Sequence, residues 1–399
     1  MSRSSAISAI DGVIAELEPE LIALRRDLHA HPELSWQEHR TTEALLQVLQ
    51  AHGVLGQIGP TGTGAVFDIG TRGPIVAIRG DIDALRLHDT KEVPYRSTVE
   101  GSCHACGHDL HAAATVGAAI ALHRSLANSG ANGRVRVILQ PAEESVPGGA
   151  QSLVAAGVMR GVDTVFALHA DPSRAVGTIG VSAGPITSAA DQIEIRLHGS
   201  GGHTGRPHQT ADLAHIAARV VVDLPMSLGR LSDPRDGLNL TFGSIQVGDA
   251  PNVIATEARL LGSLRASGRG AWESAPQHIH RLLAAIVEPL GATWELEHRT
   301  GAPPVVNDPW AVHQIEAAAV AVLGADCVGH TEQSAGGEDF SWYGDHARLG
   351  YFRLGVWDPA GLRVDLHAGG FDLDERAIGL GARVLAGSAI GALAELTSV

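Results

Sequence analysis

Apolar residues recur at intervals of three and four between residues 7 and 28 of the chain. This spacing places them on one face of a helix with 3.6 residues per turn. His31-Pro32 ends the pattern, and a second amphipathic stretch follows Trp36 and reaches Gly53. The chain therefore opens with two predicted helices.

Short apolar runs between glycines then alternate with helical stretches. The predicted strands are 64–69, 74–79, 134–139 and 164–168, and the predicted helices are 110–127 and 150–156. Polar residues follow three of these strands, namely Asp81 and Asp83, then Glu143 and Glu144, then His169. Parallel strands joined by helices end at the same edge of a sheet, where open α/β sheets place their sites. We therefore expect these side chains to converge.

The pattern changes near residue 187. Strands at 191–198, 238–247, 255–266 and 293–298, with helices at 209–224 and 272–288, give the order β-α-β-β-α-β. That order is typical of a ferredoxin-like α+β domain. We predict an α/β domain formed by residues 1–186 and 299–399, with residues 187–298 inserted as a second domain. A helix at 309–323, a strand at 349–354 and a helix at 374–395 complete the first domain.

Composition narrows the class of protein. The chain has 399 residues and a net charge of −15, which opposes nucleic-acid or anionic membrane partners because phosphate binding needs clustered Lys and Arg. We find no apolar run of membrane-spanning length and no signal peptide at the N-terminus. Three cysteines agree with a reducing compartment, so a cytoplasmic protein is expected.

The densest chemistry lies in Cys103–His111, which reads Cys-His-Ala-Cys-Gly-His-Asp-Leu-His. Thiol and imidazole groups at this spacing favour a metal site, with Gly107 allowing Cys106 and His108 to point at one place. The Cys-x-x-Cys pair also fits a redox motif or half of a structural zinc site. A structural zinc site needs a second pair, and the chain has only Cys327 besides these two.

Adjacent carboxylates at Glu143 and Glu144 suggest a division of labour, since neighbouring side chains point in different directions. One would bind metal and the other would contact the attacking water. Taken singly, a Glu-Glu turn is more often solvated, and His169 or His367 is more often an ordinary histidine. Only the whole set indicates a site.

Several motifs together carry a resemblance that covers nearly the whole chain in order. They are His29-Ala-His-Pro-Glu-Leu-Ser35, Arg79-Gly-Asp-Ile-Asp-Ala-Leu85, His104-Ala-Cys-Gly-His-Asp109, Gln140-Pro-Ala-Glu-Glu144, Gly201-Gly-His203, Pro207-His208, Asp212, Asn252-Val-Ile254, Arg265, Glu338-Asp-Phe340 and His367. The chain resembles the dinuclear metallo-amidohydrolases that include hippurate hydrolase, indole-acetyl amino acid hydrolases and N-acyl amino acid amidohydrolases. The resemblance implies a three-layer metallo-exopeptidase catalytic domain with an inserted ferredoxin-like lid, which also forms a homodimer.

The resemblance also implies roles for particular residues. The ligands of two divalent metal ions per subunit would be Cys106, His108, Glu144, His169 and His367. The general base would be Glu143, and His203 would reach the active site of the partner subunit and stabilise the oxyanion. Asn252 and Arg265 would hold the substrate carboxylate, with Glu338 as a further substrate contact. The soft ligand set favours zinc, with manganese, cobalt or nickel as alternatives.

The expected reaction is hydrolysis of N-acyl amino acids, with hippurate-like N-aroyl compounds among the candidates. A dipeptidase or carboxypeptidase with the same metal centre is one alternative, in which Glu338 or Asp339 would bind a free amine. A catalytically silent conjugate-binding protein is another. The chain departs from the family where Cys103 replaces Met, Arg86 replaces Pro and Gly337 replaces Ser, so the acyl group stays open.

Overall fold

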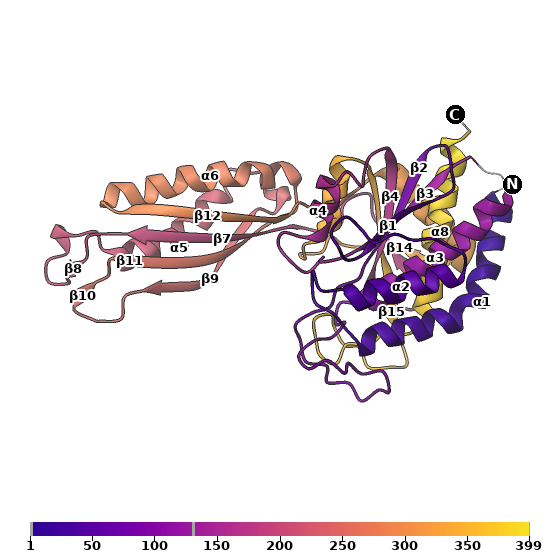
Figure 1. The fold of residues 1–399 in the computed structure, drawn as a ribbon. Helices are drawn as coiled ribbons and strands as arrows, with labels where there is room; N and C mark the ends of the chain where they lie inside the picture. Colours follow the sequence, from indigo (N-terminus) through magenta and orange to yellow (C-terminus); the bar gives the residue numbers. More distant parts are fainter. Residues whose placement is uncertain (1–2, 130–131, 399) are drawn as a thin grey trace. The chain divides into compact units, whose positions relative to one another are not determined.

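The computed structural model describes residues 3–129 and 132–398. Its helices are α1 (Arg3–Ala30), α2 (His39–Ala51), α3 (His108–Ser129), α4 (Gly149–Ala155), α5 (Leu213–Leu228), α6 (Arg269–Val287), α7 (Pro309–Leu323) and α8 (Arg376–Leu396). The longer strands are β1 (Ala65–Ile69), β2 (Ile75–Asp81), β3 (Arg134–Gln140), β4 (Val162–Ala175), β7 (Ala189–His198), β9 (Asn239–Val247), β11 (Glu257–Ala266), β12 (Thr293–Ala302) and β15 (Arg348–Trp357). Two-residue strands are β5 (Ile179–Gly180), β6 (Gly184–Pro185), β8 (Gly202–His203), β10 (Val253–Ile254), β13 (Val306–Asn307) and β14 (Val328–Gly329). Figure 1 shows these elements along the chain.

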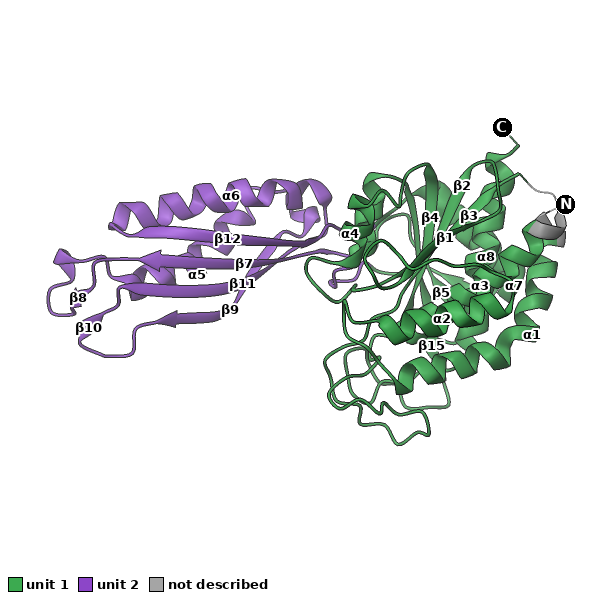
Figure 2. Cartoon of the chain, in the orientation of Figure 1, with its two compact units in different colours: residues 1–186, 306–332, 339–399 green, residues 187–305, 333–338 purple. Residues whose placement is uncertain are grey.

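The chain forms two compact units, which Figure 2 colours separately. Unit 1 contains residues 1–186, 306–332 and 339–399, and unit 2 contains residues 187–305 and 333–338. The second unit thus extends past the predicted insert of 187–298, because residues 299–305 continue β12 and its return, and a short later segment joins it.

Unit 1 is built on a seven-stranded sheet in the order β1-β3-β2-β4-β15-β5-β14. Strand β2 runs parallel to both β3 and β4, and β4 runs parallel to β15. The edge strand β1 is antiparallel to β3. The three strands that carry the polar residues therefore share one direction, as their connection by helices predicts.

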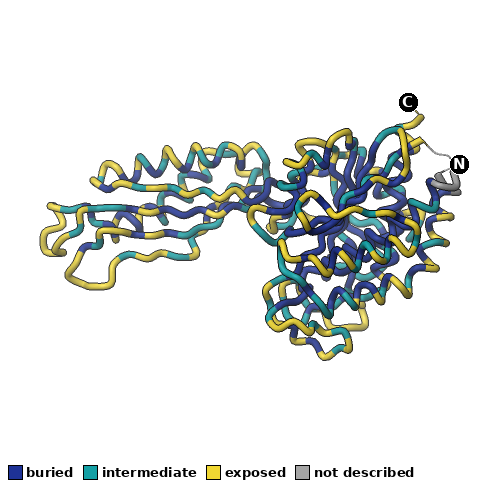
Figure 3. The backbone as a smooth tube through the Cα atoms, viewed as in Figure 1, coloured by how far each residue is buried: buried dark blue, intermediate teal, exposed yellow. Residues whose placement is uncertain are grey.

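The core of unit 1 is formed by small-residue helices packed on the sheet. Helices α3 and α8 contact each other and strand β2, and both are rich in alanine. Helix α8 is buried along almost its whole length, as the dark trace in Figure 3 shows. Alanine and glycine let helix and sheet backbones approach closely, so this packing fixes where α3 begins.

Helix α8 corrects one statement made from the sequence. Residues Arg376–Leu396 are long and apolar enough, by length and composition, to cross a membrane, although we found no such run. In the structure, 89% of the apolar window is buried inside the protein. The hydrophobicity of α8 is therefore accounted for by its place in the core.

Unit 2 has an antiparallel sheet in the order β12-β7-β11-β9. Helices α5 and α6 pack together and, with the sheet, bury a second apolar core. With its alternating strands and helices, this is the predicted ferredoxin-like arrangement. Along β11, Glu257 pairs with His198 at one end and Arg265 pairs with Ala190 at the other.

Strand β4 differs from its prediction in a way that affects the site. The predicted strand ended at residue 168, whereas β4 continues to Ala175, so His169 lies inside the strand. Pairing with β15 explains the extension, because Arg353 lies opposite His169 and the ladder continues beyond it. The side chain of His169 is therefore held by a paired strand and not by a loop.

Candidate metal centre

The turn before α3 places a thiol and an imidazole side by side. Gly107 has φ of +84°, in the left-handed region that favours glycine, and a Cβ there would lie 2.9 Å from the Cβ of Ala170. Helix α3 begins at His108, immediately after this glycine. The conformation of Gly107 thus brings Cys106 and His108 to the start of the helix, as their spacing predicts.

Five predicted ligands meet in unit 1. The Sγ atom of Cys106 lies 3.5 Å from Nε2 of His169 and 3.4 Å from Nε2 of His367. Glu144 Oε1 lies 3.5 Å from His367 Nε2 and 4.0 Å from His108 Nε2. The structure therefore brings together side chains from the α3 turn, the loop after β3, strand β4 and the tail.

The donor set fits divalent cations. Among the described residues, His108 Nε2 and Glu144 Oε1 are buried atoms without a hydrogen-bond partner, which costs free energy unless another group satisfies them. Burial raises the pKa of the Cys106 thiol, so this sulfur stays protonated until a cation displaces the proton. Thiolate, imidazole and carboxylate together suit zinc, cobalt or nickel.

Asp83 organises this cluster, a role that its position after β2 does not by itself predict. Its carboxylate accepts hydrogen bonds from the backbone N–H groups of Glu143 and Glu144, at 3.1 and 3.0 Å. It also accepts from the Ser35 hydroxyl at 2.7 Å and lies 3.3 Å from Nδ1 of His108. Burial alone would raise the pKa of Asp83, but these donors outweigh it and lower the pKa below its usual value. Asp83 is therefore a charged anchor for the loop and for one candidate ligand.

The two glutamates both reach the cluster. Carboxylate oxygens of Glu143 and Glu144 lie within 4.8 Å of each other and of a ring nitrogen of His108. Both residues occupy a turn after β3, and Glu144 also lies in a group with Cys106 and His367. The division of labour between the two carboxylates stays a prediction. Ala142, just before the two glutamates, has φ of +54°, a left-handed conformation that is uncommon for a residue other than glycine.

The predicted substrate residues of unit 2 fall into two places. Strand β8 pairs with β10, with His203 opposite Val253, and Thr204 N–H donates to the Asn252 carbonyl at 3.3 Å. His203 and Asn252 are therefore neighbours at the end of the sheet where Glu257 lies. Arg265 lies at the other end, opposite Ala190.

Gly337 lies beside Arg265 within unit 2. A Cβ at Gly337 would meet the Cβ of Ala190 at 2.6 Å and Nη1 of Arg265 at 3.7 Å. The usual serine would crowd Ala190, so glycine at this position fits the alanine that it contacts. This departure from the family thus alters the surroundings of the predicted carboxylate anchor.

Glu338 and Asp339 are both buried, and Asp339 has structural partners in unit 1. Asp339 Oδ1 accepts from Gln140 Nε2 at 2.7 Å and from Arg79 at 3.1 Å, and Oδ2 accepts from Ala150 N–H at 3.0 Å. These three bonds use the Asp339 carboxylate to hold the sheet edge. Asp339 is thus poorly placed to bind a substrate amine.

The other two departures are at residues outside the candidate ligand set. Cys103 is fully buried, and burial raises the pKa of its thiol to about 11, so the thiol is neutral. Its backbone pairs with Leu85, and Arg86 follows on the surface. All three cysteines of the chain, including Cys327, are free thiols in the structure.

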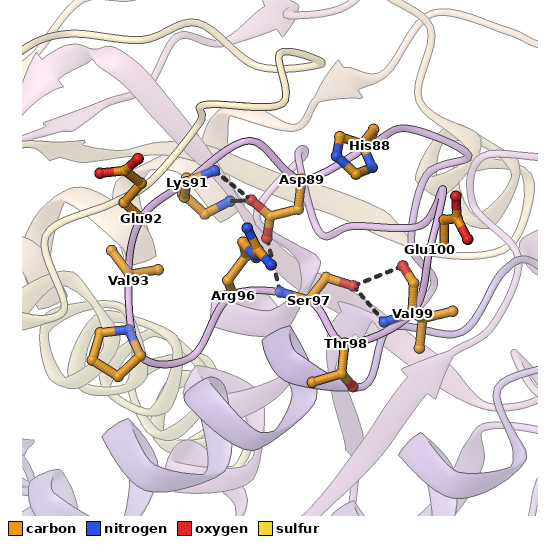
Figure 4. Close-up of a pocket in the computed structure, with 11 residues that line it drawn as sticks. His88, Asp89, Lys91, Glu92, Val93, Arg96, Ser97, Thr98, Val99 and Glu100 are labelled. Carbon is orange, nitrogen blue, oxygen red and sulfur yellow. Dashed lines mark hydrogen bonds and ion pairs between the residues drawn. The ribbon is translucent and has the colours of Figure 1, made fainter.

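A separate pocket of about 510 Å³ lies in the loop 88–100, and none of the candidate ligands lines it. Figure 4 shows Asp89 between Lys91 and Ser97, with Lys91 Nζ 3.0 Å from its carboxylate and Ser97 N–H donating at 3.0 Å. Asp89 also lies 3.4 Å from Nε2 of His29, whose Nδ1 is 2.7 Å from Asp109. Through Asp89 and His29, the loop 88–100 is therefore connected to Asp109, the residue after His108.

Known proteins resemble the chain over most of its length. A Rhodococcus jostii protein named as a glutamate-cysteine ligase 2-3 is 42% identical over 369 residues, covering 92% of this chain. This chain spans only 46% of that protein. The N-acetylcysteine deacetylase of Bacillus subtilis is 36% identical over 373 residues, covering 93% of this chain and 96% of the deacetylase.

A solved structure from Bacillus subtilis, described as a dinuclear metal-binding peptidase of the M20 family, matches with a TM-score of 0.83 and 33% identity. The match covers 95% of this chain and 99% of that one. The model for peptidase family M20/M25/M40 matches residues 77–390. The predicted resemblance, fold class and enzyme class are confirmed, and the chain belongs to peptidase family M20/M25/M40.

Proposed function

We propose that this protein hydrolyses the amide bond of N-acyl amino acids, releasing a carboxylic acid and a free amino acid. The observation that carries the proposal is the convergence of Cys106, His108, Glu144, His169 and His367 beside Glu143. The similarity to a deacetylase of an N-acyl amino acid supports the substrate class.

The five convergent side chains would hold two divalent cations, with zinc first and manganese, cobalt or nickel as alternatives. When bound, the cations supply Lewis-acid activation of water and of the amide carbonyl. Glu143 would accept a proton from the attacking water and later donate it to the leaving amine. Its backbone N–H, fixed by Asp83, keeps the carboxylate at the cluster.

Unit 2 would supply the substrate contacts and the homodimer. Glu257, at the end of β11 beside His203, and Arg265 are eight positions apart, roughly 26 Å at about 3.3 Å per residue. A small N-acyl amino acid cannot touch both ends of one sheet. We therefore assign His203 and Asn252 to the active site of a second copy, where His203 would stabilise the oxyanion.

Arg265 would anchor the free carboxylate of the substrate in its own subunit, because its guanidinium is always charged and forms paired hydrogen bonds with carboxylates. Glu338, the residue after Gly337, is proposed as a further substrate contact. A carboxylate anchor favours terminal amino acid conjugates over internal peptide bonds. We also place the protein in the cytoplasm, in keeping with its three free thiols.

A substrate panel tests the function. N-acetyl, N-benzoyl and indole-acetyl amino acids should release free amino acid from one acyl class, and chelator should stop the release until zinc or manganese is added. Dipeptides in the same panel test the peptidase alternative, in which Glu338 or Asp339 would bind a free amine. Turnover of dipeptides alone would reject the proposal, and so would metal-replete protein that turns over no substrate.

A further inference from the structure

Both ring nitrogens of His111 are engaged inside unit 1. The Nδ1 atom lies 2.6 Å from Oδ1 of Asp81, and the backbone N–H of Ala170 donates to Nε2 at 2.8 Å. All three residues are buried. Because a backbone N–H can only donate, Nε2 is the acceptor, and the ring proton therefore lies on Nδ1, directed at Asp81.

This assignment removes His111 from the candidate ligands. Its ring atoms lie within 4.8 Å of Asp81 and His108, a grouping that by distance alone could hold a cation. A cation on Nε2 would have to displace the Ala170 N–H and leave it without a partner in the core, and a cation on Nδ1 would move the ring proton to Nε2, where it would oppose the same N–H. Arg79 fixes the other oxygen of Asp81 at 2.8 Å, so the pair with His111 is itself held in place.

The residue that His111 holds is next to a candidate ligand. Nδ1 of His169 lies 2.7 Å from the Ala170 carbonyl oxygen. A carbonyl oxygen can only accept, so this nitrogen carries the proton and Nε2 keeps its lone pair. That lone pair is on the atom 3.5 Å from Cys106 Sγ. The backbone of Ala170 thus links the His111 ring to the orientation of the His169 ring.

We infer that His111 is a positioning residue for the metal site of the proposed function. Through the Ala170 backbone, it keeps the His169 ring in the orientation and tautomer that direct Nε2 into the cluster. Asp81 sets the tautomer of His111, and Arg79 sets the position of Asp81. The chain Arg79–Asp81–His111–Ala170 is therefore a support for one ligand.

Substitution of His111 should weaken cation binding more in the leucine variant than in the glutamine variant. His111→Leu removes both hydrogen bonds and should weaken one of two Co²⁺ equivalents by about 10- to 100-fold, the usual effect of losing a partner of a ligand. His111→Gln should recover most of that affinity, because its amide offers one donor and one acceptor at a similar separation. Titration of metal-free protein with Co²⁺ against a chelating indicator gives both dissociation constants.

His104→Leu is the matched control. His104 is a buried histidine of the same segment, and neither of its ring nitrogens has a hydrogen-bond partner in the described structure. This variant should keep both Co²⁺ affinities. Unchanged affinities in a folded His111→Leu protein would overturn the inference, as would equal losses in the leucine and glutamine variants.

A measurement on the wild-type protein covers the case in which His111→Leu does not fold. Long-range ¹H–¹⁵N correlation spectra of metal-free protein labelled at histidine nitrogens should show His111 and His169 as neutral rings protonated at Nδ1. Protonation of His111 at Nε2 would overturn the proposed positioning role of His111. A different outcome is that the His111 variants show the expected order of Co²⁺ affinities while the substrate panel shows no turnover. In that case the proposed reaction is wrong and the positioning role stands.

Discussion

Four donors meet at the carboxylate of Asp83, and two of them are the backbone N–H groups of Glu143 and Glu144 in the loop after β3. A charged group that accepts these bonds holds the loop without occupying the side chains of Glu143 and Glu144. The bonds to Asp83 therefore involve the backbone of these two residues and not their carboxylates. Asp83 also contacts Nδ1 of His108, so it holds the loop after β3 and this candidate ligand in place relative to each other.

Glu143→Gln should separate the general base from the ligands. The amide keeps the shape and the backbone bond to Asp83 but cannot accept the proton, so kcat should fall by about 10² to 10⁴-fold. Metal content, measured by elemental analysis, should stay at the wild-type level. Glu144→Gln should instead lower metal content, and near wild-type turnover by the Glu143 variant would remove Glu143 from this role.

At this level the sequence predicted the groups that carry chemistry better than those that support them. The Cys-Gly-His spacing indicates ligands because the glycine between the two side chains allows a turn that brings both to one place. Nothing local marks Ser35 as a donor to Asp83, or His111 as a partner of Ala170, since these contacts join segments far apart in the chain. Only the folded backbone identifies them.

Helix α3 lies close to strand β2 at Gly80. A Cβ there would lie 2.5 Å from Oγ1 of Thr115 and 2.8 Å from the His111 carbonyl oxygen. Close contact between helix and strand backbones brings Asp81, the next residue, within reach of the His111 ring. Gly80 thus determines how close α3 lies to β2, and with it the distance between His111 and Asp81.

Gly80→Ala should destabilise the protein by about 1–3 kcal/mol, because the added methyl group meets backbone that cannot move alone. Gly12→Ala is the control, since nothing lies within 4 Å of a Cβ at that exposed helix position. It should stabilise the chain by about 0.5–1 kcal/mol. Urea denaturation midpoints compare the variants. A midpoint for Gly80→Ala at or above that of the wild-type protein would contradict this packing argument.

Periodicity predicted the helices and most strands because each buries an apolar face of its own. It missed the second half of β4, where Asp171-Pro172-Ser173 has no strand pattern and pairing with β15 decides the structure. The antiparallel direction of β1 was also invisible, since an edge strand reads the same either way.

Mixing two inactive variants tests the proposed dimer. In a dimer that shares His203, a His203→Ala subunit keeps its own Glu143 and would borrow His203 from a Glu143→Gln partner. Random exchange makes half of the dimers mixed, each with one complete site, so activity should return to about a quarter of the wild-type value.

Each variant alone should stay inactive, and mixing either with a doubly substituted chain should restore nothing. Activity that never returns, with subunit exchange shown by differently tagged chains, would mean that His203 serves its own subunit or none. Sedimentation of the wild-type protein gives the oligomeric state independently.

Cys106 and His367 are in contact although they lie 261 positions apart in the sequence. During synthesis the ribosome delivers Cys106 and His108 first, then the main segment of unit 2, residues 187–305, and His367 only near the end. The complete set of five candidate ligands therefore cannot assemble before His367 has been made. Cys106, His108, Glu144 and His169 all lie within the first 169 residues, so only the last candidate ligand has to wait for the end of synthesis.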